Sequence, residues 1–251
     1  MSRQNTNLKK MVTAAILAAL VIGLQILGGI PIGPFSITLT LVPIVVGAIL
    51  LGWQYGLALG TVFGVVVSIL SITGKDPGGF MVFQANAALG WLVCVLKGAA
   101  AGLLPALFYQ FFSKKKWAPH VFMALSGAFL FLGGFAAGRA MDFGSAWKNT
   151  LFCVIFALLA AGYLLITRYA LSSGNSAVYL AAMSAPVANT GIFIVGMLLF
   201  FKDVLASWAG GSNLYLFIIS GIVGINFVIE FAVAIVLSPA IATIVKRYNK
   251  Q

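Results

Sequence analysis

Charged residues are scarce in this sequence. Only 8% of its 251 residues are Asp, Glu, Lys or Arg, against roughly a quarter in an ordinary soluble domain. Residues 11–74 contain none of the four. Because about 20 consecutive apolar residues are enough to cross a bilayer, this stretch alone has room for two or three spans. The composition therefore excludes a soluble globular protein and predicts a polytopic membrane protein.

The residue patterns of common catalytic sites are also absent. The sequence has no GxxxxGK[ST] loop for nucleotide phosphates, no HExxH and no GxSxG, so no metal-dependent or nucleophilic chemistry is indicated. The single histidine, His120, follows a proline, and Cys94 and Cys153 lie in apolar runs without CxxC spacing. We expect no enzyme activity, no metal and no cofactor. Glu230 is the one carboxyl group expected within a span, which argues against an autonomous ion-driven pump.

What the sequence has in abundance is apolar residues, with 62% hydrophobic composition and a mean hydropathy of +1.10. Breaks at clusters of Pro, Gly, Asn and charge divide the chain into about eight helices. We predict an all-α transmembrane bundle forming one integral membrane domain over residues 1–251. If the pair of helices within 117–173 does not insert, six spans remain. The predicted spans are 11–29, 36–52, 54–72, 85–112, 119–138, 148–170, 176–201 and 214–245.

The formal net charge of +11 reflects basic residues that cluster at the ends of the predicted spans. This distribution is typical of topology signals and does not indicate a nucleic-acid surface. With the N-terminus in the cytoplasm, most basic residues fall inside, and both termini are predicted to be cytoplasmic. The predicted inner residues are Arg3, Lys9, Lys10, Lys114, Lys115, Lys116, Arg168, Lys246, Arg247 and Lys250. The predicted outer ones are Lys75, Arg139, Lys148 and Lys202.

Small residues recur at helical spacing in two spans. One row consists of Gly56, Gly60 and Gly64, and another of Gly98 and Gly102. Residues without side chains allow helix backbones to approach closely within a membrane. The rows predict close helix packing.

Two charged residues fall near the middle of predicted spans, Lys97 and Glu230. Because a charge at that depth is costly, each is expected to face the bundle interior with a partner. They are candidate partners for each other, either as a structural ion pair or as ligand contacts. Residues eleven or four apart share a helix face, so Asn86 is expected beside Lys97 and Asn226 beside Glu230.

A third polar group lies in the seventh predicted span. Pro186 is expected to interrupt the helix there and leave a backbone carbonyl unpaired. The adjacent Asn189 and Thr190 would then face a cavity, with Trp91 as a flat apolar wall. Each polar side chain could equally join helices. The predicted substrate-binding set is Asn86, Trp91, Lys97, Asn189, Thr190, Asn226 and Glu230.

Four segments together resemble the substrate-binding S-components of energy-coupling factor (ECF) vitamin transporters. The segments are residues 9–64, LKGAAAGL at 96–103, APVANTGIF at 185–193 and GINFVIEFAVAIVLSPAI at 224–241. The resemblance implies a bacterial membrane protein that binds a vitamin from outside, while a transmembrane T-component and two ATPase subunits supply the energy. It also implies a pocket near the outer loop at 31–36.

The same resemblance implies a docking face for the T-component on the first span. In the family this face is an AxxxA row, and two such pairs occur here, Ala14 with Ala18 and Ala15 with Ala19. Without the resemblance, these alanines would indicate ordinary helix packing.

The sequence departs from the six-span family pattern because two further helices appear within 117–173. It also lacks the NPxxxxxPR pattern of some pantothenate-type members. Pantothenate heads the list of expected vitamins, followed by riboflavin and folate. The alternative functions are a stand-alone secondary transporter or channel for a small polar solute, or an assembly subunit that binds no solute.

Overall fold

The computed structural model describes residues 3–248, apart from residues 28, 33–34, 38, 116, 125–145, 173, 212 and 219–226. The chain divides into two compact units. Unit 1 comprises residues 1–109 and 178–251, and unit 2 comprises residues 110–177. Unit 2 encloses the predicted insertion at 117–173, whose two membrane crossings stay a prediction, as does the single domain over 1–251.

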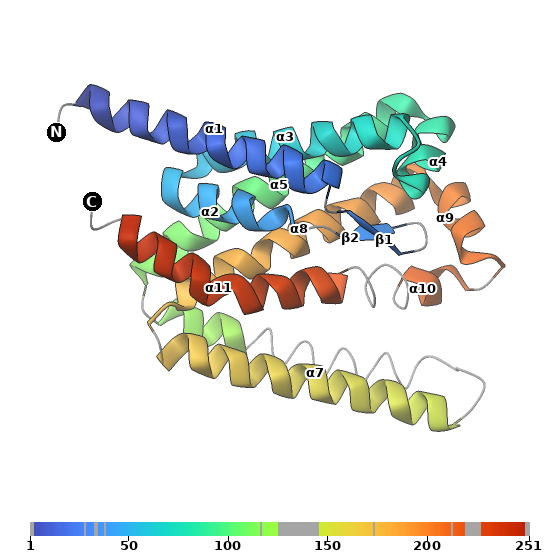
Figure 1. Cartoon of the computed structure of the whole chain (residues 1–251). Coiled ribbons are helices and arrows are strands. Elements are labelled where there is room, and N and C mark those ends of the chain that lie inside the picture. The colour runs from blue at the N-terminus through green and yellow to red at the C-terminus, as the bar shows by residue number, and fades with distance from the viewer. Residues whose placement is uncertain are drawn as a thin grey trace. The chain divides into compact units, whose positions relative to one another are not determined.

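Helices make up almost all of the described structure (Figure 1). The one exception is a short antiparallel hairpin of β1 and β2, in which Ile30 pairs with Ile37. The elements are α1 (Arg3–Leu27), β1 (Ile30–Ile32), β2 (Phe35–Ile37), α2 (Leu41–Leu51), α3 (Trp53–Ile72), α4 (Pro77–Ala85), α5 (Ala87–Lys114), α7 (Ala146–Ser172), α8 (Ser176–Phe200), α9 (Lys202–Ala209), α10 (Leu214–Phe217) and α11 (Val228–Tyr248).

Five helices of the described part are long and apolar enough to cross a membrane. They are α1, α3, α5, α8 and α11. The predicted spans at 54–72 and 176–201 agree with α3 and α8 to within a residue at each end. The all-α, multi-pass membrane class is confirmed.

The predicted span at 36–52 differs most from the structure. Residues 35–37 form β2, and the helix that follows, α2, has 11 residues. At 1.5 Å per residue it is about 16 Å long, roughly half of the hydrocarbon thickness of a bilayer. Gly52, with φ of 100°, separates it from α3, a conformation that favours glycine. Nearly all of α2 is buried, packed against α1, α3 and α11.

One further detail differs from the predictions. Pro186 does not interrupt its helix, because α8 continues through it from Ser176 to Phe200. A proline removes one backbone donor, and in α8 the surrounding packing tolerates that loss. Of the predicted span 214–245, the described part consists of α10 and α11. Residues 119–138, another predicted span, lie mostly outside the described residues.

The glycine rows form a direct backbone contact between α3 and α5. A Cβ atom on Gly60 would overlap the carbonyl oxygen of Gly98, and one on Gly102 would overlap that of Gly56. A Cβ on Gly64 would meet the backbone of Cys94. The predicted close packing is therefore present, and the two rows face each other.

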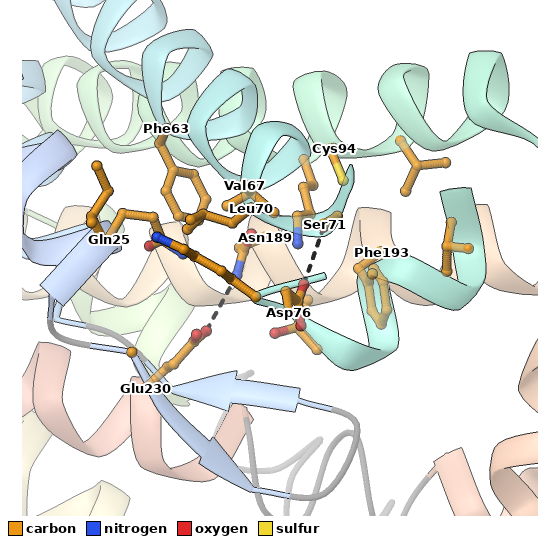
Figure 2. A pocket seen from close by; sticks show the side chains of 18 of the residues that line it. Gln25, Phe63, Val67, Leu70, Ser71, Asp76, Cys94, Asn189, Phe193 and Glu230 are labelled. Carbon is orange, nitrogen blue, oxygen red and sulfur yellow. Dashed lines mark hydrogen bonds between the residues drawn. The ribbon is translucent and has the colours of Figure 1, made fainter. Parts of the chain in front are cut away.

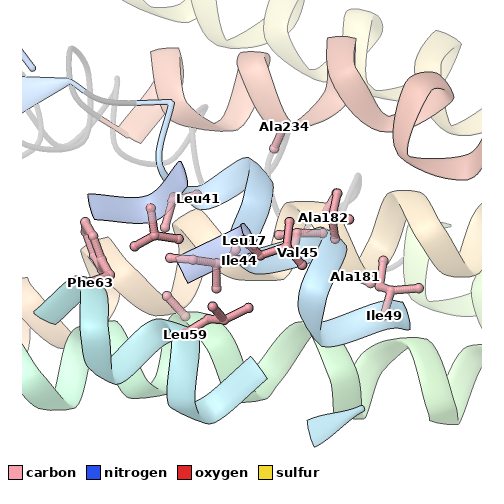
Figure 3. Packing of buried hydrophobic residues seen from close by; sticks show 14 of the residues in the cluster. Leu17, Leu41, Ile44, Val45, Ile49, Leu59, Phe63, Ala181, Ala182 and Ala234 are labelled. Carbon is pink, nitrogen blue, oxygen red and sulfur yellow. The ribbon is translucent and has the colours of Figure 1, made fainter. Parts of the chain in front are cut away.

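Beside this contact lies the hydrophobic core of unit 1, shown in Figure 3. Seven helices contribute to it, among them α1 with Leu17, α2 with Ile44, α3 with Leu59, α8 with Ala181 and α11 with Ala234. The residues that α8 contributes are mostly alanines, which leave room for the larger side chains of α1 to α3.

The two ends of unit 1 differ in chemistry. The first residues of α1 and the last of α11 lie at one end (Figure 1), and these segments carry Lys9, Lys10, Lys246 and Arg247. The hairpin, α4 and α9 lie at the other end. The second end therefore consists of short elements and turns.

The glycine contact generates a prediction. Because the Cβ of Gly60→Ala would meet the backbone of Gly98, α3 and α5 must move apart, which we expect to cost about 1–3 kcal/mol. The measurement is the melting temperature of the full chain in detergent. Gly23→Ala on α1 is the matched control, because nothing lies within 4 Å of its Cβ position. Equal melting temperatures for the two variants would contradict the prediction.

Candidate functional site

A cavity of about 220 Å³ lies within unit 1. It is lined by residues of α1, α3, α4, α5, α8, α9 and α11 and by the turn between α3 and α4. Gly29, just before β1, also borders it. The polar side chains that line the cavity are Gln25, Ser71, Lys75, Asp76, Lys97, Asn189, Thr190 and Glu230.

Four of the seven predicted binding residues line this cavity, namely Lys97, Asn189, Thr190 and Glu230. Asn86 and Trp91 do not, and Asn226 lies outside the described residues. The structure thus brings together side chains from α5, α8 and α11. Their role in binding a substrate stays a prediction.

Asn86 has a local structural role instead of the predicted position beside Lys97. It ends α4 with an extended backbone, and its side-chain oxygen accepts a hydrogen bond of 3.1 Å from the N–H of Leu89 in the first turn of α5. This is the usual task of asparagine at a helix start. Since Asn86 precedes α5, helical spacing does not relate it to Lys97. Trp91 is half-buried and meets the ring of Phe83 edge to face.

The most buried polar pair in the cavity connects α8 with α11. Asn189 and Glu230 are each 6% exposed, and Nδ2 of Asn189 donates a 3.4 Å hydrogen bond to Oε2 of Glu230 (Figure 2). Among the described residues, the side-chain oxygen of Asn189 has no hydrogen-bond partner, and neither has the hydroxyl of Thr190. A buried polar atom without a partner costs roughly 1–3 kcal/mol. These two atoms therefore mark a place where a ligand or water could bind.

Lys97 does not form the predicted ion pair with Glu230, since no such pair within 4.0 Å is found in the part of the chain that the structure describes. Its Nζ atom lies 5.0 Å from the centroid of the Phe193 ring. That ring stacks on Trp208 of α9 at 6.5 Å between centroids and 19° between planes. A lysine above an aromatic face gains a modest cation–π attraction, which leaves its hydrogen-bond donors available to an anion.

The turn between α3 and α4 borders the cavity near Phe193. Oγ of Ser71 donates a 3.2 Å hydrogen bond to Oδ2 of Asp76. Gly79 allows this arrangement, because a Cβ there would overlap the Ser71 hydroxyl. The sequence analysis missed these residues, since serine, aspartate and glycine at a span end are typical of any turn.

Gln25 was also missed, although it is the one amide side chain within the predicted span 11–29. It is buried, and its oxygen accepts a 2.9 Å hydrogen bond from the hydroxyl of Thr40. This bond joins α1 to the residue before α2 and leaves the Gln25 amide nitrogen at the cavity. An amide at mid-span is a signal that could have identified it.

The arrangement can bind a solute through both charge and hydrogen bonds. Its volume lies below the roughly 300–1,000 Å³ of drug-sized ligand sites, so only a small ligand would fit it. Apolar side chains such as Phe63 and Val67 cover part of the wall. In the described ranges, no three His, Cys, Asp or Glu residues come together in the way that a metal site would require.

The alanines of α1 lie away from the cavity lining. Ala15 and Ala19 are exposed, whereas Ala14 and Ala18 are half-buried against the core. Only 11% of the apolar window of α1 is buried, compared with 33% to 50% in the other four candidate spans. The pair Ala15 and Ala19 thus lies on an outer face of the molecule.

Comparison with known families returns one finding. A family model described as "ECF transporter, substrate-specific component" matches residues 9–242. The comparison with curated proteins and the comparison with solved structures each return no match.

The unpartnered hydroxyl of Thr190 generates a prediction for the protein without ligand. Thr190→Val and Thr40→Val are the same substitution at positions that are 4% and 0% exposed. Thr190→Val removes no hydrogen bond, so the free energy of unfolding should stay unchanged or rise. Thr40→Val leaves the buried Gln25 oxygen without its partner and should cost about 1–3 kcal/mol. Thermal or denaturant unfolding in detergent measures both, and equal losses would contradict the prediction.

Proposed function

Because the chain belongs to the substrate-specific components of ECF transporters, we propose that it captures a small water-soluble vitamin for ATP-driven uptake into a bacterial cell. Members of this family are substrate-binding membrane subunits and not enzymes. They associate with a transmembrane T-component and with ATPase subunits. The vitamin, the bacterial source and the partners of this chain are part of the proposal.

The observation that supports the proposal is the cavity, with buried polar atoms that have no hydrogen-bond partner among the described residues. A membrane protein satisfies its polar groups internally, because lipid offers no hydrogen bonds. Asn189 and Thr190 depart from this rule at one place, beside Glu230. A bound solute with polar groups would complete the missing hydrogen bonds.

Pantothenate is the first candidate among the vitamins. It combines a carboxylate, an amide and hydroxyl groups, which match the mixed donors, acceptors and charges of the cavity. Riboflavin and folate are larger molecules, and a cavity of about 220 Å³ favours the smaller solute. They remain the next candidates.

The proposed orientation has both termini in the cytoplasm. The basic residues at the ends of α1 and α11 favour that side for the terminal end of unit 1. The cavity includes residues of α4 and α9, which lie at the opposite end. A solute would then enter from outside, as expected of an importer.

We further propose that α1 is the docking helix for the T-component, through Ala15 and Ala19. Exposed small residues let a partner helix approach closely within the bilayer. The half-buried Ala14 and Ala18 are less available for this purpose.

The binding proposal predicts a vitamin-dependent stabilisation. A screen of the detergent-purified protein against the B vitamins should raise the melting temperature with one of them, because a ligand that binds only the folded state stabilises it. A nanomolar binder at micromolar concentration adds about 4 kcal/mol. Asn189→Ala should weaken that binding by about 10- to 100-fold, as expected for the loss of a hydrogen bond in a charged network.

The control is Asn7→Ala, which removes an exposed asparagine of α1 outside the cavity and should leave the affinity unchanged. Isothermal titration gives both affinities. If neither Asn189→Ala nor Glu230→Gln lowers the affinity, this cavity is not the binding site. Folded protein that responds to no vitamin contradicts the proposed function.

The docking proposal predicts a separate defect. Ala15→Leu with Ala19→Leu should leave vitamin binding intact and abolish copurification with a coexpressed T-component and its ATPases, because the larger side chains hold the partner helix away. Ala240→Leu, at an exposed position of α11, is the control and should copurify normally. Loss of vitamin binding together with docking would refute the separation of the two sites.

A further inference from the structure

The cavity presents two different chemistries at two places. Figure 2 shows Asn189 and Glu230 joined by their hydrogen bond, with Asp76 and Phe193 farther to the right in the view. Both groups of residues line the same cavity. A single small solute could therefore contact both.

The place beside Glu230 is rich in hydrogen-bond acceptors. Asn189 uses its N–H₂ group toward Glu230, so its unpartnered atom is the oxygen, an acceptor. The Glu230 carboxyl group adds further acceptor positions. The unpartnered hydroxyl of Thr190 can accept or donate. A solute that fits here must present O–H or N–H donors.

The place beside Phe193 is defined by the Lys97 ammonium group. Its Nζ lies 5.0 Å from the Phe193 ring centroid, and no carboxylate of the described residues lies within ion-pair distance of it. The residue is half-buried, so water screens its charge only in part. An ammonium group in this position is a suitable partner for an anion.

The other charged groups at the cavity limit which anion can bind there. Asp76 and Glu230 are acidic and Lys75 is basic, so two acidic and two basic side chains line the cavity, and their formal charges cancel. Asp76, held by Ser71, would repel a doubly charged group such as a phosphate more strongly than a singly charged one. The arrangement favours a carboxylate.

From this geometry we infer that the solute is a small organic acid whose carboxylate binds Lys97 and whose hydroxyl or amino donors bind the acceptors of Asn189, Thr190 and Glu230. The inference rests on the proposed function and specifies the class of vitamin that the same cavity selects. Lys97 is then the specificity-determining residue for charge. Asn189, Thr190 and Glu230 then bind the opposite end of the solute.

The test compares acids with their neutral counterparts on the full chain in detergent. Two pairs serve as probes: pantothenate with pantothenol, and biotin with biotinol. In at least one pair the acid should bind about 10- to 100-fold more tightly, the effect of one charge-assisted hydrogen bond. Titration calorimetry and the melting temperature give the affinities.

Variants then test which residues cause the preference for the acid over its neutral counterpart. Lys97→Met should reduce the ratio of acid to neutral affinity to near one, and Lys97→Arg should retain most of it. Thr190→Val should weaken both members of a pair by a similar factor and keep the ratio, because it acts at the other end. Lys202→Met, which removes one positive charge from an exposed position on α9, should change neither affinity.

The outcomes that contradict the inference differ from the outcome that contradicts the proposed function. Equal binding of acid and neutral member by the wild type overturns the inference, and this comparison stands even if Lys97→Met does not fold. A preference that survives Lys97→Met also overturns it. Binding of thiamine or pyridoxine, which have no carboxylate, without any acid overturns the inference and leaves the proposed function intact. Folded protein that binds no vitamin contradicts the proposed function itself.

Discussion

The backbone contact between α3 and α5 determines where the other parts of unit 1 can lie. Glycines on both helices allow carbonyl groups of one helix to approach the α-carbons of the other, a packing that any side chain would prevent. The same two helices provide Phe63 and Ser71 from α3 and Lys97 from α5 to the cavity. The contact restricts how the two helices can slide or rotate, and so limits where these side chains can lie. The other walls of the cavity come from α1, α4, α8, α9 and α11.

Hydrogen bonding separates the structural polar residues from the candidate binding residues. Ser68, Ser184 and Ser238 are buried, and each donates to a carbonyl oxygen of its own helix three or four residues earlier. Such bonds satisfy a hydroxyl without any partner outside the helix. Asn189 and Thr190 are buried to a similar degree and retain unpartnered atoms. Buried polar atoms without partners are costly, and a solute that supplied the missing groups would offset the cost.

The proposed function uses two separate parts of the molecule. The cavity, with its charges and unpartnered atoms, is enclosed by helices of unit 1 and would select the solute. The outer face of α1, with Ala15 and Ala19 exposed, would meet the partner that supplies energy. A subunit of this kind needs no nucleotide site of its own, which agrees with a sequence that has no phosphate-binding loop. Solute selection and partner docking then depend on different residues and can be impaired separately.

The sequence by itself determined the membrane class, the limits of α3 and α8 and the close packing of the glycine rows, and it predicted Lys97, Asn189, Thr190 and Glu230 as binding residues, although Glu230 lies in the first turn of α11 and not at mid-span. These features follow from how single residues distribute between water and lipid and from helical periodicity, which are local properties. The tertiary structure alone decided that α2 is too short to cross, that Asn86 caps the start of α5, and that Lys97 lies over Phe193 and forms no ion pair with Glu230. It also placed Gln25, Ser71 and Asp76 at the cavity. Such pairings depend on how each helix is rotated against several neighbours at once, and no single segment of sequence contains that information.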